Sequence, residues 1–210
     1  MNKKIIVFLI FIAFTLFKAN AKQLTNNVLV TIDNSIITEL DVNKEINFSK
    51  FINKDQTINN LEILKKEVIN TLIERKIKEI ETNYYKIEVS EKEIESSLYN
   101  YLEKIKINNE TLDTFYKKKE IEKDYLKNLI KIDLKWSKLI NQIYEGRLNV
   151  NLTEVNNQLE QEPKNIDDNE KFKKQLIIIE QNKLLNKFAI THLEKSKKKY
   201  LIKFLWGKKS

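Results

Sequence analysis

Residues 121–145 read IEKDYLKNLIKIDLKWSKLINQIYE, and we take the rest of the chain to be organised around them. Their apolar positions recur at helical spacing and are Ile121, Tyr125, Leu126, Leu129, Ile130, Ile132, Leu134, Trp136, Leu139, Ile140 and Ile143. A helix of this length is a rod of about 37 Å. Its apolar arc is too broad to be stable in water unless several other elements pack against it, which predicts the central helix of an all-α core. Gly146 directly follows the segment and predicts a glycine cap at the helix end.

The composition limits the fold class. The chain has 210 residues, of which 41% are hydrophobic and 32% are charged, and this is enough for one folded domain. It contains two glycines and one proline. Folds rich in sheets and loops need these residues at their turns. We therefore expect a mainly α, single-domain protein whose long helices are joined by short polar connections.

The first residues have the features of a signal peptide. Two lysines precede an apolar run at 5–17, and Ala19 and Ala21 supply small residues at the two positions that a signal peptidase reads. This apolar run of 13 residues is shorter than the roughly 20 residues that span a bilayer, which favours cleavage after Ala21 over an uncleaved anchor. We therefore expect residues 1–21 to be removed and the protein to be exported.

Cysteine usage and charge exclude several classes of partner and chemistry. The chain has no cysteine, which excludes a lipoprotein anchor, a disulfide framework and a thiol nucleophile. Removal of residues 1–21 takes away three lysines and no acids, so the formal charge of +8 becomes +5. Because an exported protein rarely meets nucleic acid, we expect no nucleic-acid partner. The modest surplus predicts weak attraction to anionic lipid surfaces or to acidic segments of a client.

Both chain ends carry strand patterns. Two β-branched runs, Val28–Ile32 and Ser35–Thr38, flank Asp33 and Asn34. They predict a tight hairpin in which Asn34 takes a positive φ. The apolar run at 200–206 predicts a strand that pairs with this hairpin and brings the two chain ends together.

Capping patterns and apolar periodicity predict the remaining helices. Thr38 with Asp41, and Ser90 with Glu93, have the spacing of capping boxes. The predicted helices span about residues 38–53, 60–85, 90–105, 112–116, 154–160 and 170–195. The residues expected to face the core are Val42, Ile46 and Phe48 in the first, Leu61, Leu64, Val68, Leu72, Ile73, Ile77, Ile80 and Tyr84 in the second, and Phe172, Leu176, Ile179, Leu184, Phe188 and Leu193 in the last.

The residues give no pattern that predicts catalysis. The single histidine, His192, lacks companions for metal binding and a neighbouring nucleophile, so we expect a solvated helix residue. The carboxylates mostly alternate with lysines at helix spacing, as they do on a solvated surface. The sequence contains no phosphate loop, nucleotide fingerprint or nucleophile elbow. We expect no catalytic residue, no bound metal and no cofactor.

The aromatic residues are the more informative set. Phe115 and Tyr116 are adjacent and point about 100° apart on one helical turn, so at least one should be partly exposed. Tyr125 and Trp136 lie on the apolar face of the central helix, where the alternative is a purely structural role. Partly exposed rings provide a large contact area without demanding a fixed sequence, as binding to unfolded chains requires. The candidate client-binding residues are Tyr101, Phe115, Tyr116, Tyr125 and Trp136.

The order of these parts resembles the SurA family of periplasmic chaperones. VLVTIDNSIITELDV at 28–42 resembles the opening hairpin and first helix of that family. NNETLD at 108–113 looks like its helix-joining segment, and NLTEVNNQL at 151–159 resembles the short helix that closes its N-terminal region. The resemblance covers residues 28–160, and the pattern at 170–206 is similar to the C-terminal element that packs back on that region.

Three departures from the family pattern affect the expectation. Ser35 and Lys86 stand where family members usually have glycine, so the local turns are expected to differ. Family members commonly carry one or two parvulin-type prolyl isomerase domains between the N-terminal region and the last helix. Here that interval is residues 161–169, a linker too short for a domain. The resemblance is therefore to the chaperone core alone.

The resemblance implies a periplasmic holdase in a Gram-negative bacterium, which binds unfolded outer-membrane and other envelope proteins through an apolar, aromatic-containing groove. It implies no nucleotide, cofactor or catalysis. Two alternatives are a peptidyl-prolyl isomerase, by family association, and a structural envelope protein anchored by an uncleaved N-terminus. The sequence leaves the client and the oligomeric state open.

Overall fold

The computed structural model describes residues 27–52, 61–117, 122–160 and 169–205. The predicted signal peptide at 1–21 lies outside the described residues, as do most of the predicted linker at 161–169, Ile121 and Trp206. Within the described ranges, no helix is long and apolar enough to cross a membrane.

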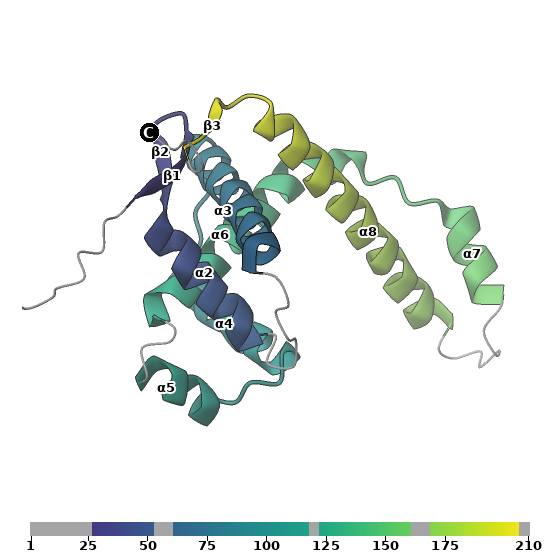
Figure 1. Cartoon of the computed structure of the whole chain (residues 1–210). Coiled ribbons are helices and arrows are strands. Elements are labelled where there is room, and N and C mark those ends of the chain that lie inside the picture. The colour runs from purple at the N-terminus through teal and green to yellow at the C-terminus, as the bar shows by residue number, and fades with distance from the viewer. Residues whose placement is uncertain (1–26, 53–60, 118–121, 161–168, 206–210) are drawn as a thin grey trace, which may run out of the picture.

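A small antiparallel sheet joins the two ends of the described chain, as predicted (Figure 1). The strands are β1 (Val28–Ile32), β2 (Ser35–Thr38) and β3 (Ile202–Phe204), in the order β2-β1-β3. Strands β1 and β2 form the predicted hairpin, and β3 pairs with the other edge of β1. The C-terminal segment therefore belongs to the same folded unit as the N-terminal hairpin.

The hairpin turn differs from the prediction by one residue. Asp33, not Asn34, takes the positive φ, at 46°. The aspartate also ties the turn to the C-terminal segment, since its Oδ1 accepts the Leu201 N–H at 2.8 Å and its own N–H donates to the Leu201 carbonyl at 3.1 Å. These two bonds hold Asp33 in its place in the turn. Aspartate is also among the residues that tolerate a left-handed conformation.

Helices make up most of the described chain. Their bounds are α2 (Glu39–Ile52), α3 (Leu61–Tyr84), α4 (Glu91–Lys104), α5 (Asn109–Lys117), α6 (Lys123–Tyr144), α7 (Leu152–Glu160) and α8 (Asn169–Lys197). Each agrees with a predicted helix to within a few residues. The protein is thus mainly α, with a small sheet formed by a hairpin near the N-terminus and a C-terminal strand.

Both predicted capping boxes are confirmed. At the start of α2, the Thr38 N–H donates to the Asp41 carboxylate at 2.8 Å, and the Asp41 N–H donates back to the threonine hydroxyl at 3.3 Å. At the start of α4, Ser90 and Glu93 exchange the equivalent pair of bonds. Each box provides acceptors for two backbone N–H groups that would otherwise be unpaired at the start of the helix.

The end of α6 is not a glycine cap. A 3₁₀ turn, η1 (Glu145–Arg147), continues the helix through Gly146, and Glu145 keeps right-handed angles with φ −49°. Gly146 has no left-handed φ, and a Cβ placed on it would meet nothing within 4 Å. The prediction of a C-terminal glycine cap is therefore wrong, because the tight 3₁₀ turn pairs a terminal carbonyl, that of Glu145 with the Leu148 N–H, without a left-handed residue.

Helix α6 contacts both hydrophobic cores, as the prediction of a central helix requires. Its C-terminal half contributes to a first core made with the sheet, α3 and the end of α8, and its N-terminal half contributes to a second core with α2, α4 and α5. The α6 residues in the first core are Trp136, Leu139, Ile140 and Tyr144, and those in the second are Leu126 and Leu129. The three predicted inward residues of α2 are also buried.

The predicted core stripe of α3 holds in the middle and is wrong at both ends. Val68, Leu72, Ile73 and Ile77 are buried. Leu61 and Tyr84, in the first and last turns, are exposed. The prediction also missed Ile69, which is buried beside this stripe; the other residues of the predicted stripe, Leu64 and Ile80, are half-buried.

The C-terminal half of helix α8 packs on α3 and α6. We call these two helices, with α2 and the sheet, the body of the protein. The last turns of α8 contact α3 and α6, whereas its first half extends away from these helices beside α7 (Figure 1). We call α7 and residues 170–184 of α8 the arm, because from Leu185 onward α8 packs against the first core. The expected core stripe of α8 is wrong along the arm: Leu193 is buried, Ile179 is exposed, and the other predicted positions are half-buried.

Candidate binding surfaces

The predicted client-binding aromatics divide between the two cores and do not form one surface. Tyr101, Tyr116 and Tyr125 are half-buried around the second core. Trp136 lies in the first core with 6% of its surface exposed, so it cannot touch a client in this structure. Phe115 belongs to α5, but its side chain lies outside the described part of the chain.

Tyr125 is held by a buried ion pair that the sequence analysis missed. The Arg75 guanidinium on α3 binds the Glu45 carboxylate on α2 with two hydrogen bonds, of 2.6 and 3.0 Å. The Tyr125 hydroxyl donates to Glu45 and accepts from Arg75 at 3.3 Å. Burial raises the pKa of Tyr125, and its bond to the Glu45 carboxylate raises it further, so the phenol stays protonated. This network fixes α2, α3 and α6 relative to one another.

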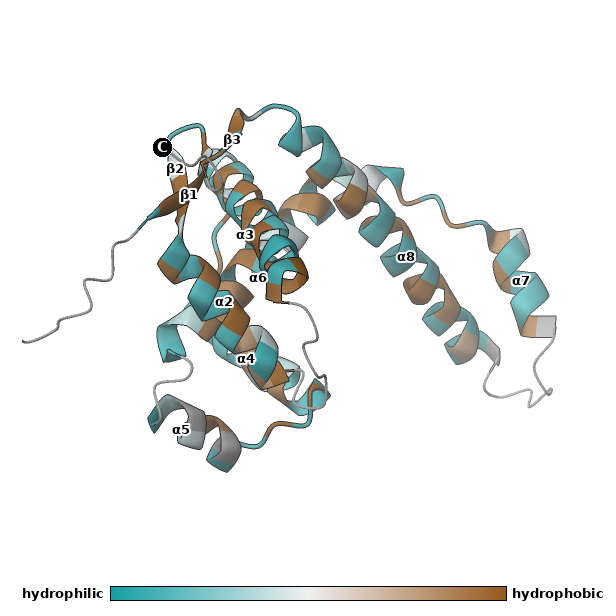
Figure 2. Ribbon diagram, in the orientation of Figure 1, coloured by the Kyte–Doolittle hydropathy of each residue, from teal (hydrophilic) through white to brown (hydrophobic). Residues whose placement is uncertain are grey.

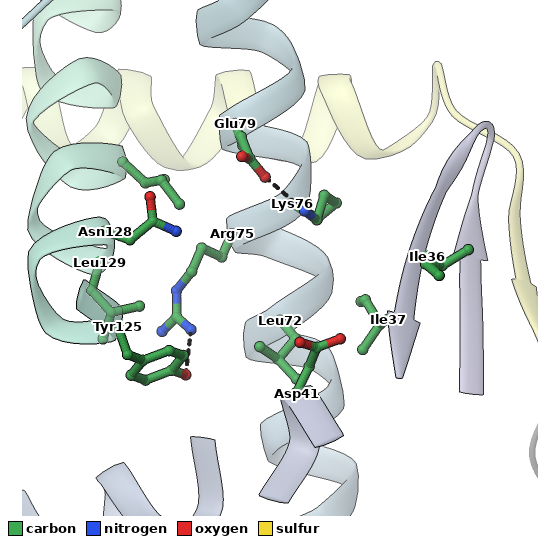
Figure 3. Close-up of a pocket in the computed structure, with 11 residues that line it drawn as sticks. Ile36, Ile37, Asp41, Leu72, Arg75, Lys76, Glu79, Tyr125, Asn128 and Leu129 are labelled. Atoms are coloured by element: carbon green, nitrogen blue, oxygen red, sulfur yellow. Dashed lines mark hydrogen bonds and ion pairs between the residues drawn. The ribbon is translucent and has the colours of Figure 1, made fainter. Parts of the chain in front are cut away.

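A small cavity lies directly beside this network (Figure 3). Its volume is about 120 Å³, and α3, α6 and the hairpin supply its walls. One side is apolar, while the other carries the Lys76–Glu79 ion pair, whose atoms are 2.7 Å apart. A cavity of this size has room for a single side chain. The apolar lining residues are Ile36, Ile37, Leu72, Leu129 and Ile132.

Other exposed rings lie outside the predicted set. Tyr99 lines a shallow hollow at the end of α4, together with Leu102 and Ile107. Tyr84 and Tyr85 contact each other edge to face, with ring centres 5.1 Å apart, where α3 ends. They were missed because the apolar period assigned Tyr84 to the core. Periodicity does not show where the helices packed against α3 end.

The arm carries apolar side chains that the rest of the described structure leaves partly exposed. Between residues 170 and 191, α8 has no buried side chain. Ile178 and Ile179 are 55% and 47% exposed, and Leu152 at the start of α7 is 53% exposed. Figure 2 shows hydrophobic segments along both helices of the arm. The apolar residues of α8 within the arm are Phe172, Leu176, Ile177, Ile178, Ile179 and Leu184, whereas Leu185, Phe188 and Ala189 pack against the first core.

The sequence of α8 explains why these side chains stay exposed. Leu176 and Ile177–Ile179 are consecutive, so their side chains point in all directions around the helix. A single neighbour, α7, covers one side, where Val155 is fully buried. Exposed lysines stand between the apolar positions, as Lys174 and Lys183 do. The arm therefore presents a mixed apolar and cationic surface that is accessible from several sides.

His192 is not the solvated residue that the sequence predicted. It is buried where α8 meets α3 and α6, with 9% of its surface exposed. Its Nδ1 lies 3.1 Å from the Tyr144 hydroxyl, and its Nε2 lies 3.6 Å from the carboxylate of Glu81, which is 2% exposed. We call Glu81, Tyr144, His192, Ser196, Lys199 and Tyr200 the seam cluster.

Two donors hold the Glu81 carboxylate within the seam cluster. Tyr200 donates its hydroxyl at 2.7 Å, and the Lys199 ammonium lies at 3.0 Å. Burial by itself raises the pKa of Glu81, but these two hydrogen bonds outweigh burial and hold the pKa below its ordinary value. Glu81 is therefore a buried carboxylate anion that joins α3 to the segment between α8 and β3.

A sequence signal for both buried acids was present. Glu81 continues the four-residue spacing of Ile73 and Ile77, and Glu45 stands three residues after the buried Val42. An acid in register with an apolar stripe indicates a buried charge that needs a partner. The partners themselves are distant in sequence, and periodicity does not identify them.

The described residues form no candidate metal centre, and the sequence matches no family model. Within the described ranges, no three His, Cys, Asp or Glu residues are grouped to hold a metal ion. No protein-family model matches the sequence, and no curated protein matches it.

Proposed function

We propose that this protein is a holdase, a chaperone that binds unfolded outer-membrane and other envelope proteins in the periplasm. The observation that carries the proposal is the arm, where residues 170–184 of α8 bury no side chain and Ile178 and Ile179 are 55% and 47% exposed. Exposed apolar side chains that are grouped on one element, rather than scattered singly, are typical of surfaces that bind a partner. The resemblance to the SurA family at 28–42, 108–113 and 151–159 points to the same class of function.

The arm suits unfolded clients better than one folded partner. Its apolar residues face several directions, so an extended chain has many alternative ways to bury side chains against it. The lysines between them attract acidic positions of a client and keep the free arm soluble. Many weak contacts lower the concentration of free chains that aggregate, and they release a client once it finds a more stable fold.

The half-buried tyrosines and the cavity beside Tyr125 supply a second place for client contacts. Ile36 and Leu129 border the cavity, which accepts one side chain at most. In this proposal the cavity adds selectivity, whereas the arm supplies most of the buried area. Trp136 keeps a structural role because it is buried.

Light scattering tests the proposal directly. A denatured outer-membrane porin is diluted into buffer with increasing amounts of the protein, and we expect scattering to fall. The double variant Ile178→Gln and Ile179→Gln removes two half-exposed isoleucines from the arm while it keeps helix-forming residues. Each lost contact weakens client binding by about 1 kcal/mol, so the amount needed for half-suppression should rise roughly thirtyfold.

The matched control is Ile190→Gln. Ile190 is on the same helix and is also exposed, but it lies near the turns that dock on the body. It should suppress aggregation as the unchanged protein does. Undiminished scattering at excess wild-type protein would overturn the holdase proposal. If the double variant suppresses aggregation as well as the wild-type protein, the arm is not the client-binding surface.

The proposal assigns no catalysis to the chain. In a refolding reaction limited by proline isomerisation, catalytic amounts of the protein should not accelerate the slow phase, and an excess should slow it. Acceleration would favour the prolyl isomerase alternative. Export is tested by mass spectrometry of the native N-terminus: Lys22 as the first residue means release, whereas an intact N-terminus favours the membrane-anchored alternative.

A further inference from the structure

We propose that the seam cluster is a pH-sensitive latch: acidification weakens the docking of the C-terminal turns of α8 on α3 and α6, and so frees the arm to move. The imidazole of His192 is wedged at the contact between these three helices. The Trp136 ring meets it edge-on, with ring centres 5.4 Å apart, and Tyr144 binds its Nδ1.

The geometry favours a neutral imidazole. His192 Nε2 is buried and has no hydrogen-bond partner within the described part of the chain, and at 3.6 Å it stands beyond hydrogen-bond distance from Glu81. The carboxylate that would stabilise a charged imidazole already accepts hydrogen bonds from Tyr200 and Lys199. The Ser196 hydroxyl, one turn along α8, is also buried without a described partner. A charged imidazole would therefore be poorly compensated.

Titration of His192 then has a definite sign. Burial lowers the pKa of His192, and attraction to Glu81 offsets this in part. When α8 leaves the body, the imidazole regains its ordinary pKa near 6.5 and takes up a proton more readily. The undocked state thus binds more protons, so docking is strongest above pH 6.5 and weakens as the pH falls below that value. Glu81 weakens docking further below pH 4.5, because its pKa is lowered in the docked state.

The groups around the imidazole do not reverse this sign. The positive charges of Lys199 and Lys195 both disfavour a positive charge on His192. Glu74 and Glu194 are already paired with Lys197, at 2.7 Å each. The titratable and charged groups around His192 are Glu74 and Glu81 on α3, Tyr144 on α6, Arg147 in η1 over the Tyr144 ring, Glu194, Lys195 and Lys197 on α8, and Lys199 and Tyr200 after it.

The latch acts at the place where α8 is attached. Upstream of residue 192, α8 buries no side chain, so the arm is held by the seam cluster, by contacts such as the stacking of Phe188 on Tyr144, and by the β3–β1 pairing. Loss of the docked turns leaves two attachments, the β3–β1 pairing and the chain segment 148–151 that joins η1 to α7. The arm then gains a range of orientations without global unfolding.

The single histidine allows the titration to be measured without ambiguity. An NMR titration of the wild-type protein follows the imidazole Cε1 proton between pH 4.5 and 8. We expect a pKa below 6.5. A pKa at or above 6.5 would overturn the latch whatever the variants show, because the docked state would then bind the proton at least as well as the undocked state.

The movement is measured by the distance between two spin labels. The chain has no cysteine, so Asn70→Cys on α3 and Asn182→Cys on the arm place labels at exposed positions and nowhere else. The docking equilibrium should fall up to tenfold for each pH unit between the two pKa values of His192, and the distance distribution should broaden from pH 7.5 to pH 5.5.

His192→Gln serves as the variant that cannot titrate. It should keep one distance distribution from pH 7.5 to 5.5. Broadening that persists in this variant, or a wild-type distribution that does not change, contradicts the proposal. If His192→Gln fails to fold by circular dichroism, the NMR titration of the wild-type protein still decides the question.

Discussion

At the scale of single residues, buried charge pairs determine where the helices sit. Glu45 and Arg75 bind each other in a bidentate pair with 6% and 20% of their side chains exposed, and Tyr125 completes the network. Arg75→Met leaves the Glu45 carboxylate buried without its cation, which should lower the free energy of unfolding by about 3 kcal/mol. Urea unfolding followed by circular dichroism measures the change.

The exposed pair of Lys183 and Glu180 is the matched control for that prediction. Lys183→Met removes an ion pair of 2.7 Å in which the lysine is 65% exposed, so stability should change by less than about 1 kcal/mol. Equal losses for the two variants would mean that the buried pair contributes no more than a surface pair. Neither partner was predicted from the sequence: the register of Glu45 with Val42 is a signal for burial that was not used, and Arg75 lies 30 positions away.

At the scale of elements, local chemistry made the helices and strands predictable. Caps such as Thr38 with Asp41 and Ser90 with Glu93 act within one turn, so a short window of sequence contains the whole interaction. The turns were harder to predict, because the left-handed residue of the hairpin depends on Leu201, which is 168 positions from Asp33. Gly146 was misjudged for a related reason, since composition alone does not distinguish a glycine cap from a 3₁₀ turn.

Gly146→Ala tests that correction. Because Gly146 is not left-handed and a Cβ there meets nothing within 4 Å, alanine should raise the free energy of unfolding by about 0.5 kcal/mol, chiefly by restricting the unfolded chain. Thermal unfolding measures it as a rise in Tm. Lys86→Gly after α3 is the contrasting change, because Lys86 is left-handed, with φ 53°, whereas Gly146 is not. Glycine at position 86 relieves the strain of a left-handed residue that has a side chain. A loss of stability in Gly146→Ala would restore the predicted glycine cap.

At the scale of the whole molecule, the sequence predicted that the chain ends meet but not that α8 extends beyond the body. Periodicity at Phe172, Leu176 and Leu184 indicates an apolar face, and a face without a partner has the same pattern as one that is covered. Trp136 shows the same limit, because its position on an apolar face does not distinguish a buried ring from one that a client can reach, and it is buried. Whether a face is covered depends on where other elements end, and local sequence does not encode this.

The pairing of β3 with β1 gives the last prediction, because it fastens the C-terminal segment to the hairpin. Lys203 is opposite Thr31, and the bonds of Leu201 and Leu205 to the hairpin on either side place the Lys203 N–H toward β1 and the Phe204 N–H toward the outer edge. Lys203→Pro removes a ladder bond and should destabilise the protein by about 2 kcal/mol in urea unfolding. Phe204→Pro, which removes an outward N–H, should cost less than half as much, since proline is tolerated at that edge. Equal effects would mean that β3 is dispensable and that α8 is held by its packing on α3 and α6 alone.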